Sequence, residues 1–332
     1  MRVAVVFLLC VAVLSAASTP SPALLVLSKG DTALEIVDPA SLNILASVPC
    51  GPDPHEVVAS TDGKLAYVSN YGGGKYNTLS VIDLAAQQPL PKIDLGALRG
   101  PHGLAYSDGK VWFTAEAAKA IGSYDPATKK VDWILGTGQN RTHMLWLSED
   151  LERMVTSNVN SATVTMIDKT FNNGGGPVPP HPDWNETVVP VGRGSEGFDV
   201  SPDGKEIWVA NAQDGTISII SVSTKKVIQT LDANVGGANR LKFTRDGKLV
   251  FVSRLSGADV SVFDAASRAV MKRINIGHGA AGILMQPDGA RAYVACTPDN
   301  YVTVIDLKSM AVAGRIGPIK NPDGLAWAVG SR

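Results

Sequence analysis

Three of the five histidines in this 332-residue sequence stand at matching places in separate segments. His55, His102 and His143 each come two residues before a short apolar run. Imidazole nitrogens are common ligands of transition metals, and such sites usually draw their ligands from several segments. The sequence therefore predicts a divalent or transition metal ion as cofactor, provided that the fold brings the three segments together.

Four further segments carry another residue at the same place. These equivalent residues are Glu196, Asn239, Ala281 and Asp323. We predict Asp323 as the fourth metal ligand, because imidazoles and a carboxylate together form a common donor set. Glu196 or Glu116 would then act as acid and base. Arg240 or Arg254 would orient the substrate.

A second group of mainly polar residues ends the next apolar run of each segment and is expected to face the same site. The group consists of Lys29, Asn70 with Tyr71, Glu116, Asn158, Asn211, Arg254 and Thr297. We predict that a small molecule is contacted by a rim made of Lys29, Asn70, Tyr71, Asn158, Asn211 and Asn239.

Two other interpretations of the three histidines remain open. Polar residues at strand starts can simply bind water and neighbouring backbone in a wet channel, or protonated imidazoles can bind an anion in a pH-dependent way. His181 and His278 lie outside the register and are interpreted as surface residues. The sequence contains no nucleotide-binding loop, nucleophile elbow, zincin helix or haem-attachment motif, which excludes several common enzyme classes.

An internal repeat predicts the elements that would position these residues. A turn between two short apolar runs recurs six times, with its aspartate at Asp62, Asp108, Asp150, Asp203, Asp246 and Asp288. An Asp-Gly step between such runs is a strong hairpin signal. Successive aspartates are 42 to 53 residues apart, the length of one four-stranded propeller blade.

Each unit continues with a third apolar run that ends in aspartate, as at Asp83 and Asp306, and with a fourth run after a short turn. The longest spacing between turn aspartates, from Asp150 to Asp203, contains an insertion at residues 171–186 with three consecutive glycines. We predict that this insertion is a surface loop between the third and fourth strands of one blade.

The two ends of the chain supply a seventh unit. Residues 24–48 contain the last three strands of a blade, and residues 322–327 (PDGLAW) are typical of a first strand. Joining them removes the exposed sheet edges between the first and last blades. The predicted fold is all-β, a seven-bladed β-propeller of four-stranded blades closed by pairing the C-terminal strand with the N-terminal blade.

The runs at residues 66–70 (AYVSN), 207–211 (IWVAN) and 302–306 (VTVID) resemble the YVTN repeat of seven-bladed β-propellers. This resemblance covers nearly all of the chain after its N-terminal segment. One unit, with PHGL at residues 101–104 and WFTAE at 112–116, instead resembles the repeat of streptogramin (virginiamycin B) lyases. The second resemblance implies a metal-dependent enzyme.

The N-terminal segment has the features of a cleaved signal peptide. Arg2 precedes an apolar run at residues 3–14, and small residues follow at 15–18. We predict a signal peptide at residues 1–18 and a single domain at 19–332, secreted or periplasmic, without a membrane anchor and monomeric. Cys50 and Cys296 then remain, as one disulfide or as two free thiols.

Charge argues against nucleic acid as a partner. The 30 basic and 31 acidic residues leave a net charge of −1, and no basic run could neutralise a row of phosphates. The predicted function is that of an exported enzyme with a metal site at the channel mouth, acting on a small molecule. It would be a lyase or hydrolase with zinc or magnesium, or an oxidoreductase with copper or iron. The alternative is a non-catalytic propeller that binds a ligand or a protein.

Overall fold

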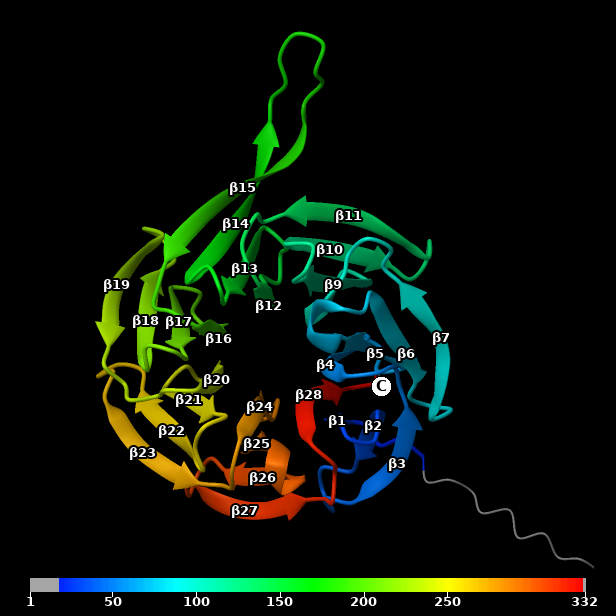
Figure 1. Ribbon diagram of the computed structural model, residues 1–332, viewed down its shortest axis with the longest axis vertical. Coiled ribbons are helices and arrows are strands. Elements are labelled where there is room, and N and C mark those ends of the chain that lie inside the picture. The colour runs from blue at the N-terminus through cyan, green and yellow to red at the C-terminus, as the bar shows by residue number, and fades with distance from the viewer. Residues whose placement is uncertain (1–17, 331–332) are drawn as a thin grey trace, which may run out of the picture.

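The computed structural model describes residues 18–330. Within this range, 28 strands form seven four-stranded antiparallel sheets, arranged as blades around a central channel (Figure 1). The predicted seven-bladed β-propeller is therefore confirmed. Residues 1–17, which contain most of the predicted signal peptide, lie outside the described part.

Each blade is named here by its order along the chain, and its strands run from the channel outward. Blade 1 contains β28 (Pro322–Ala328), β1 (Ala23–Ser28), β2 (Ala33–Val37) and β3 (Ile44–Pro49). Blade 2 contains β4 (Pro54–Ala59), β5 (Leu65–Asn70), β6 (Thr78–Asp83) and β7 (Gln88–Asp94). Blade 3 contains β8 (Pro101–Ser107), β9 (Lys110–Ala115), β10 (Ala120–Asp125) and β11 (Lys130–Gly136). Blade 4 contains β12 (Thr142–Leu147), β13 (Arg153–Asn158), β14 (Thr163–Asn172) and β15 (His181–Pro190).

The remaining three blades follow the same plan. Blade 5 contains β16 (Ser195–Val200), β17 (Glu206–Asn211), β18 (Thr216–Ser221) and β19 (Lys226–Leu231). Blade 6 contains β20 (Ala238–Phe243), β21 (Leu249–Arg254), β22 (Asp259–Asp264) and β23 (Val270–Asn275). Blade 7 contains β24 (Ala280–Met285), β25 (Arg291–Cys296), β26 (Tyr301–Asp306) and β27 (Ala311–Ile316). Two short 3-10 helices, η1 (Gly72–Gly74) and η2 (Thr297–Asp299), follow β5 and β25.

The core lies between neighbouring blades. The second and third strands are apolar on both faces because each face packs against another blade, and β17, for example, buries every residue from Ile207 to Asn211. Trp208 of blade 5 packs edge-on against Phe243 of blade 6, with ring centroids 5.7 Å apart. The outer strand β19 is mostly exposed. This packing fixes the inner strands rigidly around the channel.

The ring closes where the two ends of the chain meet. β28 pairs with β1 in antiparallel register, with Ala23 opposite Ala328 and Val26 opposite Leu325. The sheet of blade 1 is completed by strands from opposite ends of the chain, as predicted, and this pairing closes the ring.

The insertion in blade 4 forms a ribbon that projects from the rim of the disc (Figure 1). It lies between the third and fourth strands, as predicted, but most of it is strand rather than loop. β14 and β15 stay paired out to Asn172 opposite His181. Trp184 packs on Trp133 of blade 3 with ring centroids 5.5 Å apart. This aromatic contact anchors the root of the ribbon.

The structure also settles the state of the two cysteines. Cys50 and Cys296 are both free thiols, and Cys296 is buried. Among residues 18–330, no helix has the length and apolar character needed to cross a membrane.

Candidate metal centre at the channel mouth

The seven equivalent residues at the starts of the inner strands, called ring residues below, meet around one cavity, as the repeat predicts. They are His55, His102, His143, Glu196, Asn239, Ala281 and Asp323. The cavity has a volume of about 210 Å³ and is lined by Lys29, His55, His102, Arg141, His143, Glu196, Asn239, Arg240, Leu255, Ala281, Thr297 and Asp323. Every blade therefore contributes the first part of its inner strand to one small site at the end of the channel.

Glycines allow the inner strands to approach closely enough to form this ring. A Cβ atom at Gly103 would lie 2.6 Å from the carbonyl oxygen of His143, and one at Gly324 would lie 2.5 Å from that of His55. Such distances are shorter than any van der Waals contact, so only glycine fits. The residue after the ring position thus sets how near the neighbouring blade's side chain can come.

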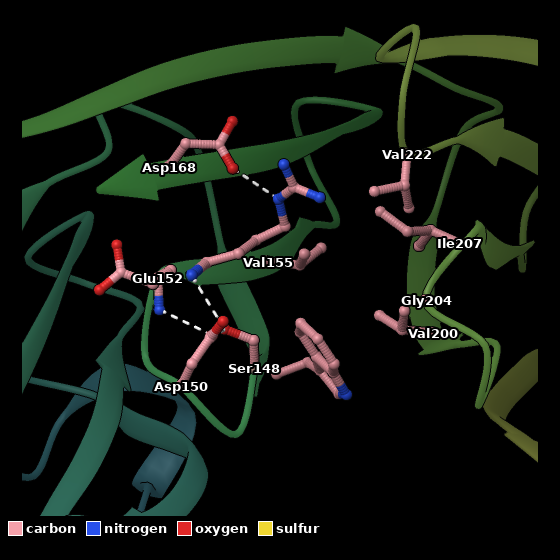
Figure 2. A pocket seen from close by; sticks show the side chains of 11 residues that line it. Ser148, Asp150, Glu152, Val155, Asp168, Val200, Gly204, Ile207 and Val222 are labelled. Carbon is pink, nitrogen blue, oxygen red and sulfur yellow. Dashed lines mark hydrogen bonds and ion pairs between the residues drawn. The ribbon is translucent and has the colours of Figure 1, made fainter. Parts of the chain in front are cut away.

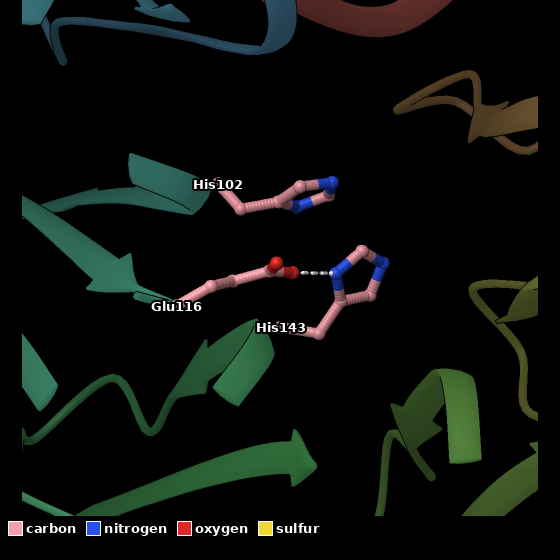
Figure 3. Close-up of side chains that lie close together, drawn as sticks. All are labelled: His102, Glu116 and His143. Atoms are coloured by element: carbon pink, nitrogen blue, oxygen red, sulfur yellow. Dashed lines mark hydrogen bonds and ion pairs between the residues drawn. The ribbon is translucent and has the colours of Figure 1, made fainter. Parts of the chain in front are cut away.

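Three side chains converge on the wall formed by blades 3 and 4. His102, Glu116 and His143 each offer a ligand atom, and these atoms all lie within 4.8 Å of one another (Figure 3). The three residues are 1%, 6% and 1% exposed. Two imidazoles and a carboxylate are a donor set that zinc and other first-row metals accept.

His143 lies between two carboxylates. Its Nδ1 shares a hydrogen bond with Oε1 of Glu116, and its Nε2 is 2.9 Å from Oε1 of Glu196 but not aligned for a hydrogen bond. Burial lowers the pKa of His143, but the two carboxylates outweigh burial and raise it above its ordinary value. Burial likewise raises the pKa of Glu196, but the positive charges of His143 and Arg141 lower it to about 2.

His102 has an unsatisfied nitrogen. Its Nδ1 is buried and has no hydrogen-bond partner among residues 18–330. Its ring centroid lies 3.8 Å from that of His143, with the ring planes tilted by 38°, and 4.7 Å from that of His55. Burial, followed by the neighbouring His143, lowers the pKa of His102 well below its ordinary value. A buried imidazole nitrogen without a partner is available to a ligand.

Two of the predicted metal ligands take a different place. His55 accepts a hydrogen bond of 2.9 Å at Nδ1 from Nζ of Lys29, which also contacts Asp53 at 3.2 Å and Asp323 at 3.3 Å. His55 and Asp323 therefore form an ion-pair cluster on the wall of blades 1 and 2. Glu116, predicted as acid and base, takes the place of the carboxylate ligand beside His102 and His143.

The three predicted rim asparagines do not line the cavity. Asn70, Asn158 and Asn211 are fully buried, and each bonds to hydroxyls on the third strand of its own blade. In Asn211, for example, Nδ2 donates to Thr216 and Ser218, both at 2.9 Å. The repeat uses its asparagine to join two strands, so the expectation that these residues contact a substrate is corrected.

Of the remaining predicted residues, some line the cavity and others do not. Lys29, Glu196 and Asn239 line the cavity, whereas Arg254 pairs with Asp259 of its own blade and is not part of the wall. Tyr71 lies beside the site, where its hydroxyl donates to Oε2 of Glu116. Its ring centroid is 4.8 Å from that of His55.

Arg240 lines the cavity but is engaged elsewhere. It is 7% exposed at its side chain and forms an ion pair with Glu56 of blade 2. Both residues come one position after the equivalent residues of their blades, His55 and Asn239. Because its guanidinium is held by Glu56, Arg240 is not free to orient a substrate as predicted.

Sequence reasoning missed Arg141 and Glu56. Arg141 lies between the two acids of the site, with Nε 3.6 Å from Glu116 and Nη2 3.4 Å from Glu196. It precedes His143 by two residues, in a turn outside the apolar runs that mark the repeat. Glu56 directly follows His55, and its partner could not be found without the distance across the channel.

Acidic groups outnumber permanent cations at the mouth. The carboxylates of Asp53, Glu56, Glu116, Glu196 and Asp323 contact the cations of Lys29, Arg141 and Arg240. With neutral imidazoles, the excess is two negative charges. One divalent cation would balance it.

Solved structures agree with the fold. A protein of unknown function from Desulfotomaculum acetoxidans has a TM-score of 0.73 at 16% identity, over 94% of this chain and 100% of that one. A putative 6-phosphogluconolactonase from Bacteroides uniformis has a TM-score of 0.72 at 15% identity, over 92% and 99%. Kuenenia stuttgartiensis hydrazine synthase has a TM-score of 0.66 at 15% identity, over 82% and 89%.

Sequence comparison gives a narrower result. No curated protein has a matching sequence. Residues 180–291 match the family described as YNCE-like beta-propeller. The resemblance of blade 3 to streptogramin lyases stays a prediction. The chain is a seven-bladed β-propeller, and its residues from blade 4 to blade 7 resemble the YNCE-like family.

Proposed function

We propose that this protein is a metal-dependent enzyme that acts on a small molecule at the channel mouth, as a lyase or hydrolase. The observation that carries the proposal is the convergence of His102, Glu116 and His143. These residues come from the strands β8 and β12 and from the turn after β9, and all three are buried. Because the surrounding blades are rigid, the donor set is held ready without a change of fold.

The residues at the site fit a divalent cation on two further grounds. Nδ1 of His102 is buried without a hydrogen-bond partner in the described chain, and Nε2 of His143 contacts only the carboxylate of Glu196, at 2.9 Å. With the imidazoles neutral, as metal ligands must be, the excess of two negative charges around the mouth also favours a dication.

The remaining residues of the cavity suit an acid–base reaction. A bound divalent metal would supply Lewis acidity, polarising a carbonyl or activating water. Glu196 stands at the edge of the cavity, 13% exposed, where its carboxylate can accept a proton from the substrate or from water. Tyr71 holds Glu116 from the other side. The cavity volume of about 210 Å³ restricts substrates to small molecules.

Metal analysis tests the proposal. We expect about one equivalent of transition metal in wild-type protein reconstituted with Zn²⁺ or Mn²⁺, and none in the variants His102→Ala and His143→Ala. The matched control is His278→Ala, because His278 is an exposed histidine that also pairs with a carboxylate, Asp299 at 3.3 Å. Full metal content in a His102→Ala/His143→Ala double variant would overturn the proposed ligand set.

Turnover separates the enzyme from the alternative of a binding propeller. We expect the metal-loaded protein to cleave members of a panel of small esters, lactones and amides, and Glu196→Gln to lose turnover while keeping its metal. Metal binding without turnover of any member, or by any elimination assay on the same compounds, would instead favour a non-catalytic ligand-binding protein.

We further propose that the protein acts outside the cytoplasm. The basis is the sequence of residues 1–18, with Arg2, an apolar run and small residues before the mature domain. Expression of the full chain followed by mass spectrometry of the exported fraction should find an N-terminus near residue 19. An intact N-terminus in a cytoplasmic fraction would contradict export.

A further inference from the structure

The position two residues before each ring residue has a left-handed backbone in all seven blades. Its φ lies between 49° and 74° at Asn321, Asp53, Gly100, Arg141, Gly194, Gly237 and Gly279. A positive φ at every equivalent point indicates that the entry turn of the inner strand requires this conformation. Glycine adopts it without steric cost, and four blades use glycine.

Arginine is an unexpected residue at this position. Asparagine and aspartate tolerate positive φ because their short side chains bond locally, and Asp53 does so by accepting from the backbone N–H of Gly72 at 2.8 Å. Arg141 has a φ of 58° and makes no such local bond among those found in the described chain. A strained residue that glycine could replace points to a use for its side chain.

The side chain of Arg141 reaches into the cavity and is only loosely held there. Its contacts with Glu116 and Glu196 are 3.6 Å and 3.4 Å long, and one third of its side chain is exposed. Arg240, the other guanidinium of the cavity, is buried in its pair with Glu56. Arg141 is therefore the guanidinium that a molecule in the cavity can contact.

We propose that Arg141 binds an oxyanion group of the substrate, a carboxylate or a phosphate, and that this binding is coupled to occupancy of the metal site. Guanidinium groups bind both kinds of oxyanion through paired N–H donors. The proposal rests on the proposed metal centre, and it assigns the substrate class as small anions.

The coupling follows from a shared carboxylate. Glu116 contacts both Arg141 and His143, so a cation bound by Glu116 and the two histidines draws negative charge away from the guanidinium. An oxyanion then restores the balance of charge at Arg141. Because coupling between two binding sites is reciprocal, the oxyanion must tighten metal binding by the same factor.

Equilibrium dialysis of Mn²⁺ against wild-type protein tests this, with acetate or methylphosphonate added at constant ionic strength and free Mn²⁺ corrected for complexation. We expect at least one oxyanion to lower the Kd for Mn²⁺ by about fivefold or more. Acetate and methylphosphonate separate the carboxylate from the phosphate substrate class.

Two variants make the result specific. Arg141→Gly removes the guanidinium and relaxes the backbone, so it should fold, bind Mn²⁺ at least as tightly as wild type and lose the response to the oxyanion. Arg254→Gln removes an arginine outside the cavity and should keep the full response.

The outcomes distinguish this inference from the proposed function. Mn²⁺ binding that no oxyanion strengthens, or a response that persists unchanged in Arg141→Gly, would overturn the anion site and leave the metal centre intact. Absence of Mn²⁺ binding in wild type would overturn both proposals.

Discussion

Arg240 of β20 and Glu56 of β4 form an ion pair between strands on opposite sides of the channel (Figure 1). Their side chains are only 7% and 14% exposed, so the two buried charges stabilise each other. Loss of Glu56 removes the strongest charge interaction of the buried Arg240, and we expect Glu56→Gln to lower the free energy of unfolding by ~3–5 kcal/mol. Urea denaturation at neutral pH measures this change.

The double variant provides the control for that prediction. Arg240→Met/Glu56→Gln removes both charges and should regain much of the stability that Glu56→Gln loses, because no unpaired charge remains. Equal or greater loss in the double variant would mean that packing, rather than charge pairing, holds the two strands.

The buried asparagines should matter for folding and not for the site. Asn211→Ala removes two hydrogen bonds between β17 and β18, and we expect it to destabilise the protein by ~1–3 kcal/mol. Metal affinity should be unchanged, because Asn211 does not line the cavity. A variant with native stability and metal content but impaired turnover would restore the substrate role that the sequence predicted.

Asp168 should make stability depend on pH at the cleft between blades 4 and 5, which has a volume of about 300 Å³ (Figure 2). Burial raises the pKa of this carboxyl, but the contacts with Arg153 and Lys225 outweigh burial and lower it below its ordinary value. A carboxyl whose pKa is lowered in the folded state stabilises the protein at pH values above its ordinary pKa near 4. This stabilisation is lost as the pH falls through the pKa of the folded state.

We therefore expect Asp168→Asn to cost ~1 kcal/mol at pH 7 and progressively less below about pH 4. Urea denaturation of both proteins between pH 7 and pH 3 checks the trend. Asp232→Asn serves as the comparison, since Asp232 is exposed and has no ion pair among the described residues. A difference that grows as the pH falls would contradict the assigned ion pairs.

At residue 141, the left-handed backbone should make a glycine variant more stable than an alanine variant, the reverse of the usual order. Arg141→Ala and Arg141→Gly both remove the guanidinium, but only glycine relieves the left-handed conformation, so the glycine variant should be more stable by ~1 kcal/mol. At Lys130, an exposed strand residue, alanine should instead be better than glycine. Thermal or urea denaturation of the four variants decides the matter.

The fold was predictable because each blade repeats the same local signals. Asp-Gly turns, apolar runs and the split blade at the two ends together require seven units and a closed ring. The ribbon was harder to predict, because the aromatic contact between Trp184 and Trp133 that supports its root joins residues of different blades. The run of glycines and prolines near its tip favoured a loop.

The ring positions were predictable for the same reason, since equivalent residues of a repeat occupy equivalent places. The role of an individual residue depended on where its side chain points, which the repeat does not specify. Asn70, Asn158 and Asn211 turn back into their blades, whereas Glu116, which follows an equivalent strand, reaches His143. Arg254 and Arg240 are both neutralised by acids that are found only once side-chain distances are known.

The closure of the ring at blade 1 also allows circular permutation of the chain. The backbone N–H of Gly330 donates to Oγ of Ser21 at 2.9 Å, so the two ends of the domain lie side by side. A short linker could therefore join them, and new ends could be opened at the tip of the ribbon, at residues 173–180. Such a circular permutant would keep every blade, add a covalent connection to the hydrogen-bonded seam of blade 1, and leave the channel mouth unaltered.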